Sequence, residues 1–389
     1  MSKNLISSTR NLVLVLLGFT FPLSVALSNI LVVLLAVLIL VEGSFSEKIQ
    51  KINSSKWMLS ILILWAMYII SWSIFGRSTD TFWMFKRISL LLLLPIFYTS
   101  NFSEKTIYKS VFAFLISMFI SSSTAIAINY GIINLNYGSF KLAAFLEYTD
   151  HNVFLAFSLI ISLYSLFRMK LQKKYKNILL IFIIFYLFSI FTEGGRSGQL
   201  VFLFSTFYFI YFQFKKNITI LLISIAGILV FSVVVYNTSE PVKKRYHYER
   251  VVKKMFNGET DRNILLKETI TLIKENPIFG YGTGSFTDEF SLVNEKTKKL
   301  VNENEINTPH NNYLYVWFEL GFLGLIVFLS IFYFQIKELI NKTDGIFRVL
   351  FPIIFLIIMI SDNYLYAPHS LILYLFLSII TINYQCKPS

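Results

Sequence analysis

Charged side chains are scarce in this chain: only 15% of its 389 residues are Asp, Glu, Lys or Arg, whereas 55% are hydrophobic. Soluble domains carry about 25% charged residues, so this composition excludes an ordinary soluble protein. Apolar runs of roughly 18 or more residues, the length that spans a bilayer as a helix, recur throughout, and no small-residue cleavage site follows the first run. The sequence therefore predicts an all-α, polytopic integral membrane protein.

Cysteine is almost absent as well, because Cys386 is the only one. A single cysteine excludes internal disulfides and cysteine-rich zinc sites. Ionisable groups are rare inside the apolar runs, whereas a proton or ion relay would place Asp, Glu or Lys at mid-membrane depth. The sequence shows no cluster of metal ligands, so we expect neither a metal ion nor another cofactor.

Positive charge is abundant by contrast, with a net charge of +13. Such charge suits nucleic acid, but in a membrane protein Lys and Arg more simply hold loops in the cytoplasm. Basic residues fill every second loop, beginning with Lys3 and Arg10, which predicts a cytoplasmic N-terminus. The breaks separate about 12 transmembrane helices, namely 11–25, 27–42, 57–75, 83–99, 107–129, 151–167, 177–192, 196–214, 218–236, 310–335, 345–361 and 368–384. The first two form one run around Pro22, either two short spans or one broken helix.

This topology divides the chain into three parts. Residues 1–236 are a predicted N-terminal transmembrane bundle of about nine spans, and residues 237–309 are one large, partly helical periplasmic loop. Residues 310–389 are about three C-terminal spans. The outer face also receives the short segments 130–151, 192–198 and 361–369, so we expect the functional groups there.

One outer segment places a histidine before a long apolar run, "PHNNYLYVWFELGFLGLIVFL" (309–329). Thr308 is a predicted N-cap with Pro309 at the first helical position, which puts His310 in the first turn. The positive end of a helix dipole disfavours an imidazolium, so we expect a neutral ring able to accept a proton. Asn311 could orient the ring or a ligand. Taken alone, a histidine at a membrane interface is more often structural than catalytic.

A second outer segment, "TEGGRSGQLVFLF" (192–204), places an arginine on the outer face, whereas Lys and Arg are usually concentrated in the cytoplasmic loops. The guanidinium group of Arg196 can donate hydrogen bonds to two phosphate oxygens at once. An ion pair with Glu193, or snorkelling to the interface, explains the residue equally well. Lys86 and Arg87, near the outer end of span 83–99, could also reach phosphate, although snorkelling is favoured for both.

The third segment, "TDRNILLKETITLIKENPIFGYGTGSF" (260–286), lies in the large loop. Asp261 could cap a helix that starts at Arg262 and ends at Asn276 and Pro277. The glycines that follow could suggest a dinucleotide fingerprint, which needs a preceding strand and a following helix. Since neither is visible, these glycines predict a tight turn. Two further glycines, Gly321 and Gly324 in the apolar run after His310, would permit close helix packing.

Together the three segments, in this order, resemble the O-antigen ligase and O-antigen polymerase superfamily of bacterial membrane glycosyltransferases, over about residues 185 to 335. Each motif alone is weak, and the N-terminal half matches only in hydropathy. The resemblance implies a multi-pass enzyme of the bacterial inner (cytoplasmic) membrane with its active site facing the periplasm. It would transfer a glycan from an undecaprenyl-diphosphate carrier to a sugar hydroxyl of lipid A–core, in the lipid bilayer and without nucleic acid.

The resemblance also implies roles for individual residues. His310 would be the base or the acceptor-orienting residue, and Arg196 and Arg262 would hold the diphosphate. Arg245, a basic residue after a proline, is a looser match to a substrate-binding position, and Asn311, Lys86 and Arg87 complete the predicted substrate-binding set. The reaction would be metal-independent, and attack from the face opposite the leaving group would invert the anomeric centre.

Two other functions remain open at this point. A polymerase of the same superfamily would join carrier-linked repeat units, although the single long outer loop with the histidine at its end is more typical of the ligases. A lipid-linked-glycan transporter belongs to a different class. It would be expected to line a central cavity with charges across the membrane depth, and such charges are missing from the sequence.

The topology can be tested by labelling. Single cysteines at Asn257 and Ser291, in a Cys386→Ser background, should react with an impermeant thiol reagent in intact spheroplasts, because both positions are predicted to lie outside the cytoplasm. Labelling that requires a broken membrane would overturn the topology and the predicted position of the site.

Overall fold

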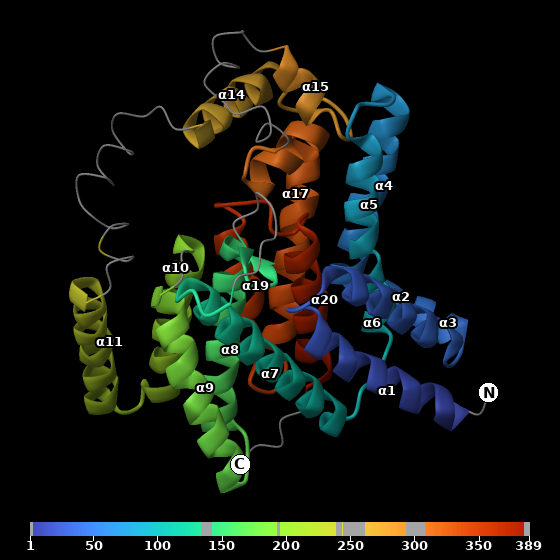
Figure 1. The fold of residues 1–389 in the computed structure, drawn as a ribbon. Helices are drawn as coiled ribbons and strands as arrows, with labels where there is room; N and C mark the ends of the chain where they lie inside the picture. The colour runs from blue at the N-terminus through green and yellow to red at the C-terminus, as the bar shows by residue number, and fades with distance from the viewer. Residues whose placement is uncertain are drawn as a thin grey trace.

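Helices make up nearly all of the chain that the structure describes. A computed structural model describes residues 3–133, 142–192, 195–238, 243, 261–292 and 308–384 (Figure 1). Its first helices are α1 (Lys3–Thr20), α2 (Val25–Val41), α3 (Phe45–Asn53), α4 (Lys56–Phe75), α5 (Thr81–Leu91), α6 (Leu93–Tyr98) and α7 (Glu104–Asn129). They are followed by α8 (Tyr148–Arg168), α9 (Lys173–Thr192), α10 (Arg196–Phe214), α11 (Ile218–Thr238), α14 (Asp261–Glu275), α15 (Phe286–Ser291), α17 (Asn312–Ile340), α18 (Gly345–Arg348), α19 (Leu350–Ile358) and α20 (Pro368–Asn383). A short antiparallel hairpin, β1 (Leu142–Ala143) and β2 (Leu146–Glu147), pairs Leu142 with Glu147 before α8.

Each of the twelve predicted spans coincides with one helix or with two consecutive helices. By length and composition, seven helices in the described part of the chain can cross a membrane, or eight if α2 and α3, which meet at 110°, form one span. Gly345–Ile358 and Pro368–Asn383 are apolar but shorter. The all-α class is confirmed and a multi-pass membrane protein is supported, whereas the count of about twelve spans stays a prediction. The run around Pro22 is two helices, with Ser24 as the N-cap of the second.

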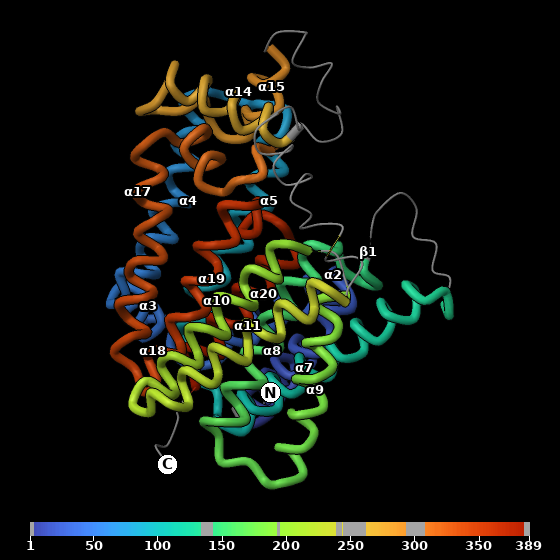
Figure 2. The backbone as a smooth tube through the Cα atoms, turned by 90° about the vertical axis from the view of Figure 1, so that its left-hand side faces the viewer, coloured from blue at the N-terminus to red at the C-terminus, as the bar shows by residue number. Residues whose placement is uncertain are grey.

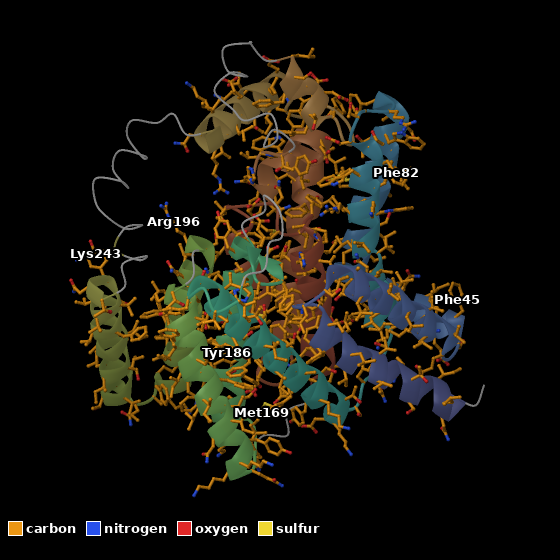
Figure 3. All side chains as sticks on the ribbon, viewed as in Figure 1. Phe45, Phe82, Met169, Tyr186, Arg196 and Lys243 are labelled. Atoms are coloured by element: carbon orange, nitrogen blue, oxygen red, sulfur yellow. The ribbon has the colours of Figure 1, made fainter. Side chains whose placement is uncertain are left out.

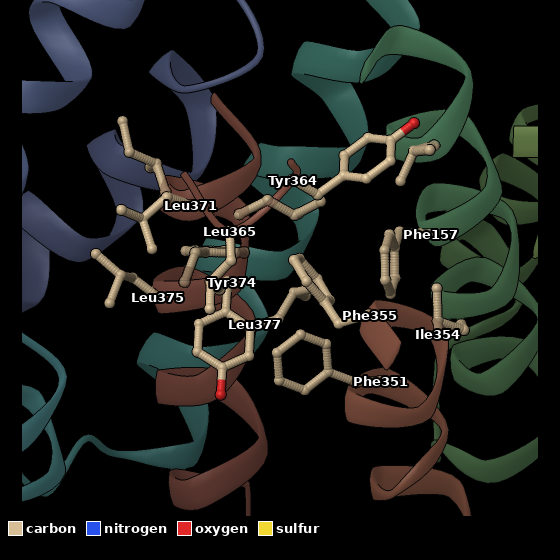
Figure 4. Close-up of a cluster of buried hydrophobic side chains, with 14 of the residues drawn as sticks. Phe157, Phe351, Ile354, Phe355, Tyr364, Leu365, Leu371, Tyr374, Leu375 and Leu377 are labelled. Atoms are coloured by element: carbon tan, nitrogen blue, oxygen red, sulfur yellow. The ribbon is translucent and has the colours of Figure 1, made fainter. Parts of the chain in front are cut away.

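Part of the hydrophobic core lies where α8, α19 and α20 meet. Figure 4 shows Phe157 of α8 facing Phe351 and Phe355 of α19, with Tyr374 of α20 beside them. The ring centroids of Phe355 and Tyr374 are 5.0 Å apart, a separation typical of attractive aromatic pairs. In contrast, α11 stands at the edge of the bundle, and only 6% of its apolar window is buried inside the protein.

A small unit, called the cap here and consisting of residues 261–292, covers one end of the bundle. It contains α14, a glycine-rich turn and α15, and Figures 1 and 2 show it above the ends of α17 and α4. The Thr283 hydroxyl donates to the carbonyl of Tyr68 at 2.7 Å, and the Thr81 hydroxyl donates to the carbonyl of Thr283 at 3.0 Å. The amide of Thr79 donates to Asp288 at 2.8 Å. The cap is therefore tied to the ends of α4 and α5.

The cap also fills a break in α17. Gly321 has a φ of 68°, which interrupts the helix. The carbonyls of Phe318 and Glu319 accept from the amides of Tyr281 and Gly282, at 2.8 and 3.0 Å. The amide of Phe322 donates to the Pro277 carbonyl at 2.9 Å. Because backbone groups left unpaired in an apolar setting cost several kcal/mol each, the turn is the partner that allows this helix to be broken.

Two predictions about glycines meet different outcomes. The turn predicted after α14 is confirmed, since Gly280, Gly282 and Gly284 all have positive φ. The prediction that Gly321 serves close helix packing is wrong. A Cβ at Gly321 would lie 1.9 Å from the carbonyl oxygen of Ile278 in the turn, so its neighbour is the cap and not another helix.

Replacing Gly321 tests the clamp between the cap and α17. Gly321→Ala should destabilise the purified protein by on the order of 2–4 kcal/mol, because it adds a clash to an unfavourable φ. Thermal unfolding in detergent measures the effect. Gly227→Ala, in α11 where a Cβ would meet nothing within 4 Å, is the matched control. Equal unfolding temperatures for the two variants would contradict the clamp.

Candidate functional site

His310 lies just outside α17 and not in its first turn. The helix begins at Asn312, and its N-cap is Asn311, whose side-chain oxygen accepts from the amides of Tyr313 and Leu314. The predicted N-cap at Thr308 is therefore wrong. The side-chain oxygen of Asn311, three residues further along the chain, accepts from the free N–H groups at the start of the helix. His310 instead adopts a left-handed conformation with a φ of 50°. A non-glycine residue there is uncommon and marks a position held by its surroundings.

Asp362, in the segment between α19 and α20, holds the imidazole. Nδ1 of His310 lies 3.0 Å from Oδ1 of Asp362. An ionised carboxylate only accepts hydrogen bonds, so Nδ1 must donate, which leaves Nε2 of a neutral ring as a proton acceptor. Burial raises the pKa of Asp362, but the hydrogen bond from His310 and the charges of His310 and Arg262 lower it more, so this pKa lies below its ordinary value. The carboxylate therefore stays ionised at neutral pH.

Arg262 approaches the same histidine from the cap. It lies in the first turn of α14, which begins at Asp261, and its guanidinium donates to the carbonyl of His310 at 3.3 Å. The Arg262 side chain is exposed and 33% of the His310 side chain is exposed. Both groups are therefore accessible to a ligand, and the cap positions the cation beside the imidazole.

Arg196 is joined to this cluster through its neighbour. It is the first residue of α10, and Figure 3 shows it at the upper end of that helix, directed away from the bundle. The hydroxyl of the next residue, Ser197, lies 3.0 Å from that of Ser361, which immediately precedes Asp362. Within the described residues Arg196 makes no hydrogen bond. Glu193, its alternative partner, lies outside the described residues.

The glycines around Arg196 explain how α10 comes so close. A Cβ at Gly195 would lie 2.6 Å from the side chain of Asn152, and one at Gly198 would lie 2.3 Å from the backbone of Asn152. These glycines therefore permit helix α8 to approach α10 closely. The beginning of α10 consequently packs against the beginning of α8.

The other predicted site residues have different surroundings. Arg87 donates to the carbonyl of Tyr366 and lies 4.5 Å over the ring of Trp83, so its guanidinium is already held. Lys86 is exposed on α5 and makes no hydrogen bond within the described residues. The side-chain nitrogen of Asn311 donates to the carbonyl of Ile360 at 3.1 Å, so this amide has structural partners at both ends. Arg245 lies outside the described residues.

Asp362 is the residue that the sequence analysis missed. A signal was present, because Asp362 is the only acidic residue after Asp344 and stands in an outer segment between two apolar runs. The sequence alone does not show which outer segment faces His310, so the pairing appears only in the folded chain.

The region beside Asp362 contains a cavity of about 240 Å³. It is lined by Trp83, Arg87, Glu147, Thr149, Asp150, Thr308, Asp362, Asn363, Tyr364, Tyr366, Ala367 and Pro368. Burial and the neighbouring Asp362 carboxylate raise the pKa of Glu147. In the described part of the chain, no group of three or more His, Cys, Asp or Glu residues is arranged to hold a metal ion.

Comparison with known proteins finds a family match over the segment that contains Arg196, Arg262 and His310. Residues 178–329 match the O-antigen ligase family model. No curated protein matches the chain. The matched segment contains Arg196, Arg262, His310 and the break of α17, and it ends before Asp362. The resemblance to the O-antigen ligase and polymerase superfamily is thereby confirmed over these residues.

Substitutions at Asn311 separate a structural role from a ligand contact. Asn311→Ala should lower stability by about 1 kcal/mol, the usual cost of losing an N-cap, whereas Asn311→Ser keeps a capping oxygen and should lose less. Thermal unfolding of both variants is the measurement. Unchanged unfolding of the Ala variant together with weaker substrate binding would show instead that the amide serves the ligand.

Proposed function

We propose that the chain is an O-antigen ligase. It transfers a glycan from an undecaprenyl-diphosphate carrier to a sugar hydroxyl of lipid A–core, at the periplasmic face of the bacterial inner membrane. The observation that carries the proposal is the contact of His310 with Asp362, with Arg262 bound to the same histidine. This cluster supplies a proton acceptor and a fixed cation, the two groups that glycan transfer from a diphosphate requires.

In the proposed reaction, an acceptor hydroxyl attacks the anomeric carbon as the bond from that carbon to the diphosphate oxygen breaks. The hydroxyl proton passes to Nε2 of His310. The Asp362 carboxylate fixes the tautomer and stabilises the imidazolium that forms, as a carboxylate does in other catalytic dyads. General-base help of this kind contributes ~10²–10⁴-fold. Attack opposite the leaving group inverts the anomeric centre.

The leaving diphosphate gains negative charge, and Arg196 and Arg262 are proposed to stabilise it. Two guanidinium forks can each hold one phosphoryl group, and cations fixed in advance need no reorganisation during the reaction. The contact between Ser197 and Ser361 supports this role, because it brings the residue beside Arg196 to the segment that holds Asp362. Arg262 contacts the backbone carbonyl of His310, whose ring is held by Asp362 in the same segment.

The identity of the acceptor separates a ligase from a polymerase. Both enzymes would use the same base and the same diphosphate site, so the cluster around His310 fits either reaction. Reconstitution with a carrier-linked glycan and two acceptors, lipid A–core and a second carrier-linked repeat unit, distinguishes them. A ligase forms product only with lipid A–core.

His310 and Asp362 should be needed for transfer but not for folding. His310→Ala should lower turnover by ~10²–10⁴-fold with little change in thermal unfolding. His310→Gln, which keeps a donor for Asp362 but cannot take up a proton, should be equally inactive. Asp362→Asn should also lower turnover, because the ring loses the acceptor that fixes its tautomer. Near-normal turnover of the His310→Gln variant would exclude the base.

A double-substitution cycle tests whether the two arginines share one ligand. Arg→Lys at position 196 or 262 should weaken transfer, because Lys keeps the charge and loses the bidentate geometry, and Arg→Ala should weaken it further. The double Ala variant should lose less than the sum of the single losses in log rate. Lys337→Ala, at the other end of α17, controls for the loss of a charge. Strict additivity would place the two arginines at separate sites.

A further inference from the structure

The cavity beside Asp362 is separate from the residues predicted to bind the diphosphate. Its lining includes neither His310, Arg196 nor Arg262. Helix α5 contributes Trp83 and Arg87, and the remaining lining residues come from segments 147–150, 308 and 362–368. At about 240 Å³ it lies just below the ~300–1,000 Å³ typical of small-molecule pockets, which suits one sugar ring and not an oligosaccharide.

The charges of the lining disfavour a phosphate. Three carboxyl groups, of Glu147, Asp150 and Asp362, line the cavity together with one guanidinium, that of Arg87. The guanidinium is engaged by the Tyr366 carbonyl and by the Trp83 ring. A phosphorylated or diphosphate group would find the one guanidinium already engaged and would face the ionised Asp362 carboxylate, whereas sugar hydroxyls are good donors to carboxylates.

Asn363 supplies a second, independent indication of a polar ligand. Its side chain is 7% exposed, and neither its oxygen nor its nitrogen has a hydrogen-bond partner within the described residues. A buried amide without partners costs about 1–3 kcal/mol, so such groups are normally satisfied by a ligand or water. Asn363 also lines the cavity, so a hydroxyl pair bound there would lie beside this unpartnered amide.

Trp83 adds an apolar surface to the same cavity, with one face of its ring covered by the Arg87 guanidinium. One region of a pyranose ring presents only C–H groups and packs on an aromatic ring, and a tryptophan provides a large, rigid surface for this contact. An aromatic platform combined with carboxylates and an unpartnered amide is therefore complementary to a neutral sugar.

We propose that this cavity, lined by Trp83, Glu147, Asp150 and Asn363, is the subsite for the acceptor sugar and selects a neutral pyranose. The inference rests on the proposed glycan transfer. Asp362 joins the two sites, because it lines the cavity and orients His310. Asp362 thereby connects the acceptor subsite to the base, while the diphosphate stays with the arginines. Trp83 and Asn363 act as specificity-determining residues.

Steady-state kinetics and direct binding test the subsite. Trp83→Ala and Asn363→Ala should each raise the acceptor KM about tenfold, with the donor KM and kcat close to those of the wild-type protein, and Trp83→Phe should restore part of the loss. The probes for binding in nanodiscs are a deacylated core oligosaccharide and a repeat-unit oligosaccharide, each with and without phosphate. The wild-type protein should bind the phosphate-free form of one of them more tightly, and both Ala variants should weaken that binding.

The matched control is Phe82→Ala, on the same helix, because the Phe82 side chain is 78% exposed and does not line the cavity. It should leave binding and KM unchanged. Asn363→Ala removes no hydrogen bond, so its thermal unfolding should stay close to that of the wild-type protein.

The possible outcomes distinguish this inference from the proposed function. An increase in the donor KM alone, unchanged binding in both Ala variants, no binding of either oligosaccharide, or tighter binding of the phosphorylated forms would each overturn the acceptor subsite. In any of these cases, transfer by the wild-type protein would leave the ligase function standing. Binding that depends on Trp83 and Asn363 without any transfer would refute the ligase function and retain the sugar site.

Discussion

The break in α17 at Gly321 is the constraint on which the rest of the structure depends. A helix in an apolar setting cannot leave backbone groups unpaired, so the carbonyls released by the break require donors from elsewhere. The turn of the cap supplies those donors, and its Gly284 amide also donates to the side chain of Glu319 at 2.7 Å. Neither segment would be stable in this form without the other.

That clamp positions the functional groups. It fixes the cap over one end of the bundle, and α14 then brings Arg262 to the carbonyl of His310. The same end receives the beginning of α10 through its glycine contact with α8, and it receives Asp362 between two further helices. A cluster built from four distant parts of the chain therefore depends on helix ends, where side chains can meet without burying a charge in the membrane interior.

Asp362 has two neighbours with different chemistry. Its carboxylate contacts His310, which is also bound by Arg262, and these two residues suit a proton and a phosphate. Asp362 also lines a cavity with carboxyl groups, an unpartnered amide and an indole, which suits a neutral sugar. In a glycosyl transfer, the acceptor sugar and the diphosphate-linked donor must be bound close enough for the new bond to form. The segment between α19 and α20 is the element that places them side by side.

The sequence by itself determined the all-α class, the approximate positions of the helices and the three segments that carry Arg196, Arg262 and His310, because hydropathy and local motifs act over short stretches of chain. It also predicted the turn at Gly280 to Gly284, which depends on local backbone geometry. Only the tertiary structure decided that Gly321 breaks a helix, that Asn311 and not Thr308 caps it, and that Asp362 is the partner of His310. The physical reason is that each of these three features depends on which hydrogen-bond partner is available. Packing between helices, and not proximity in sequence, determines that partner.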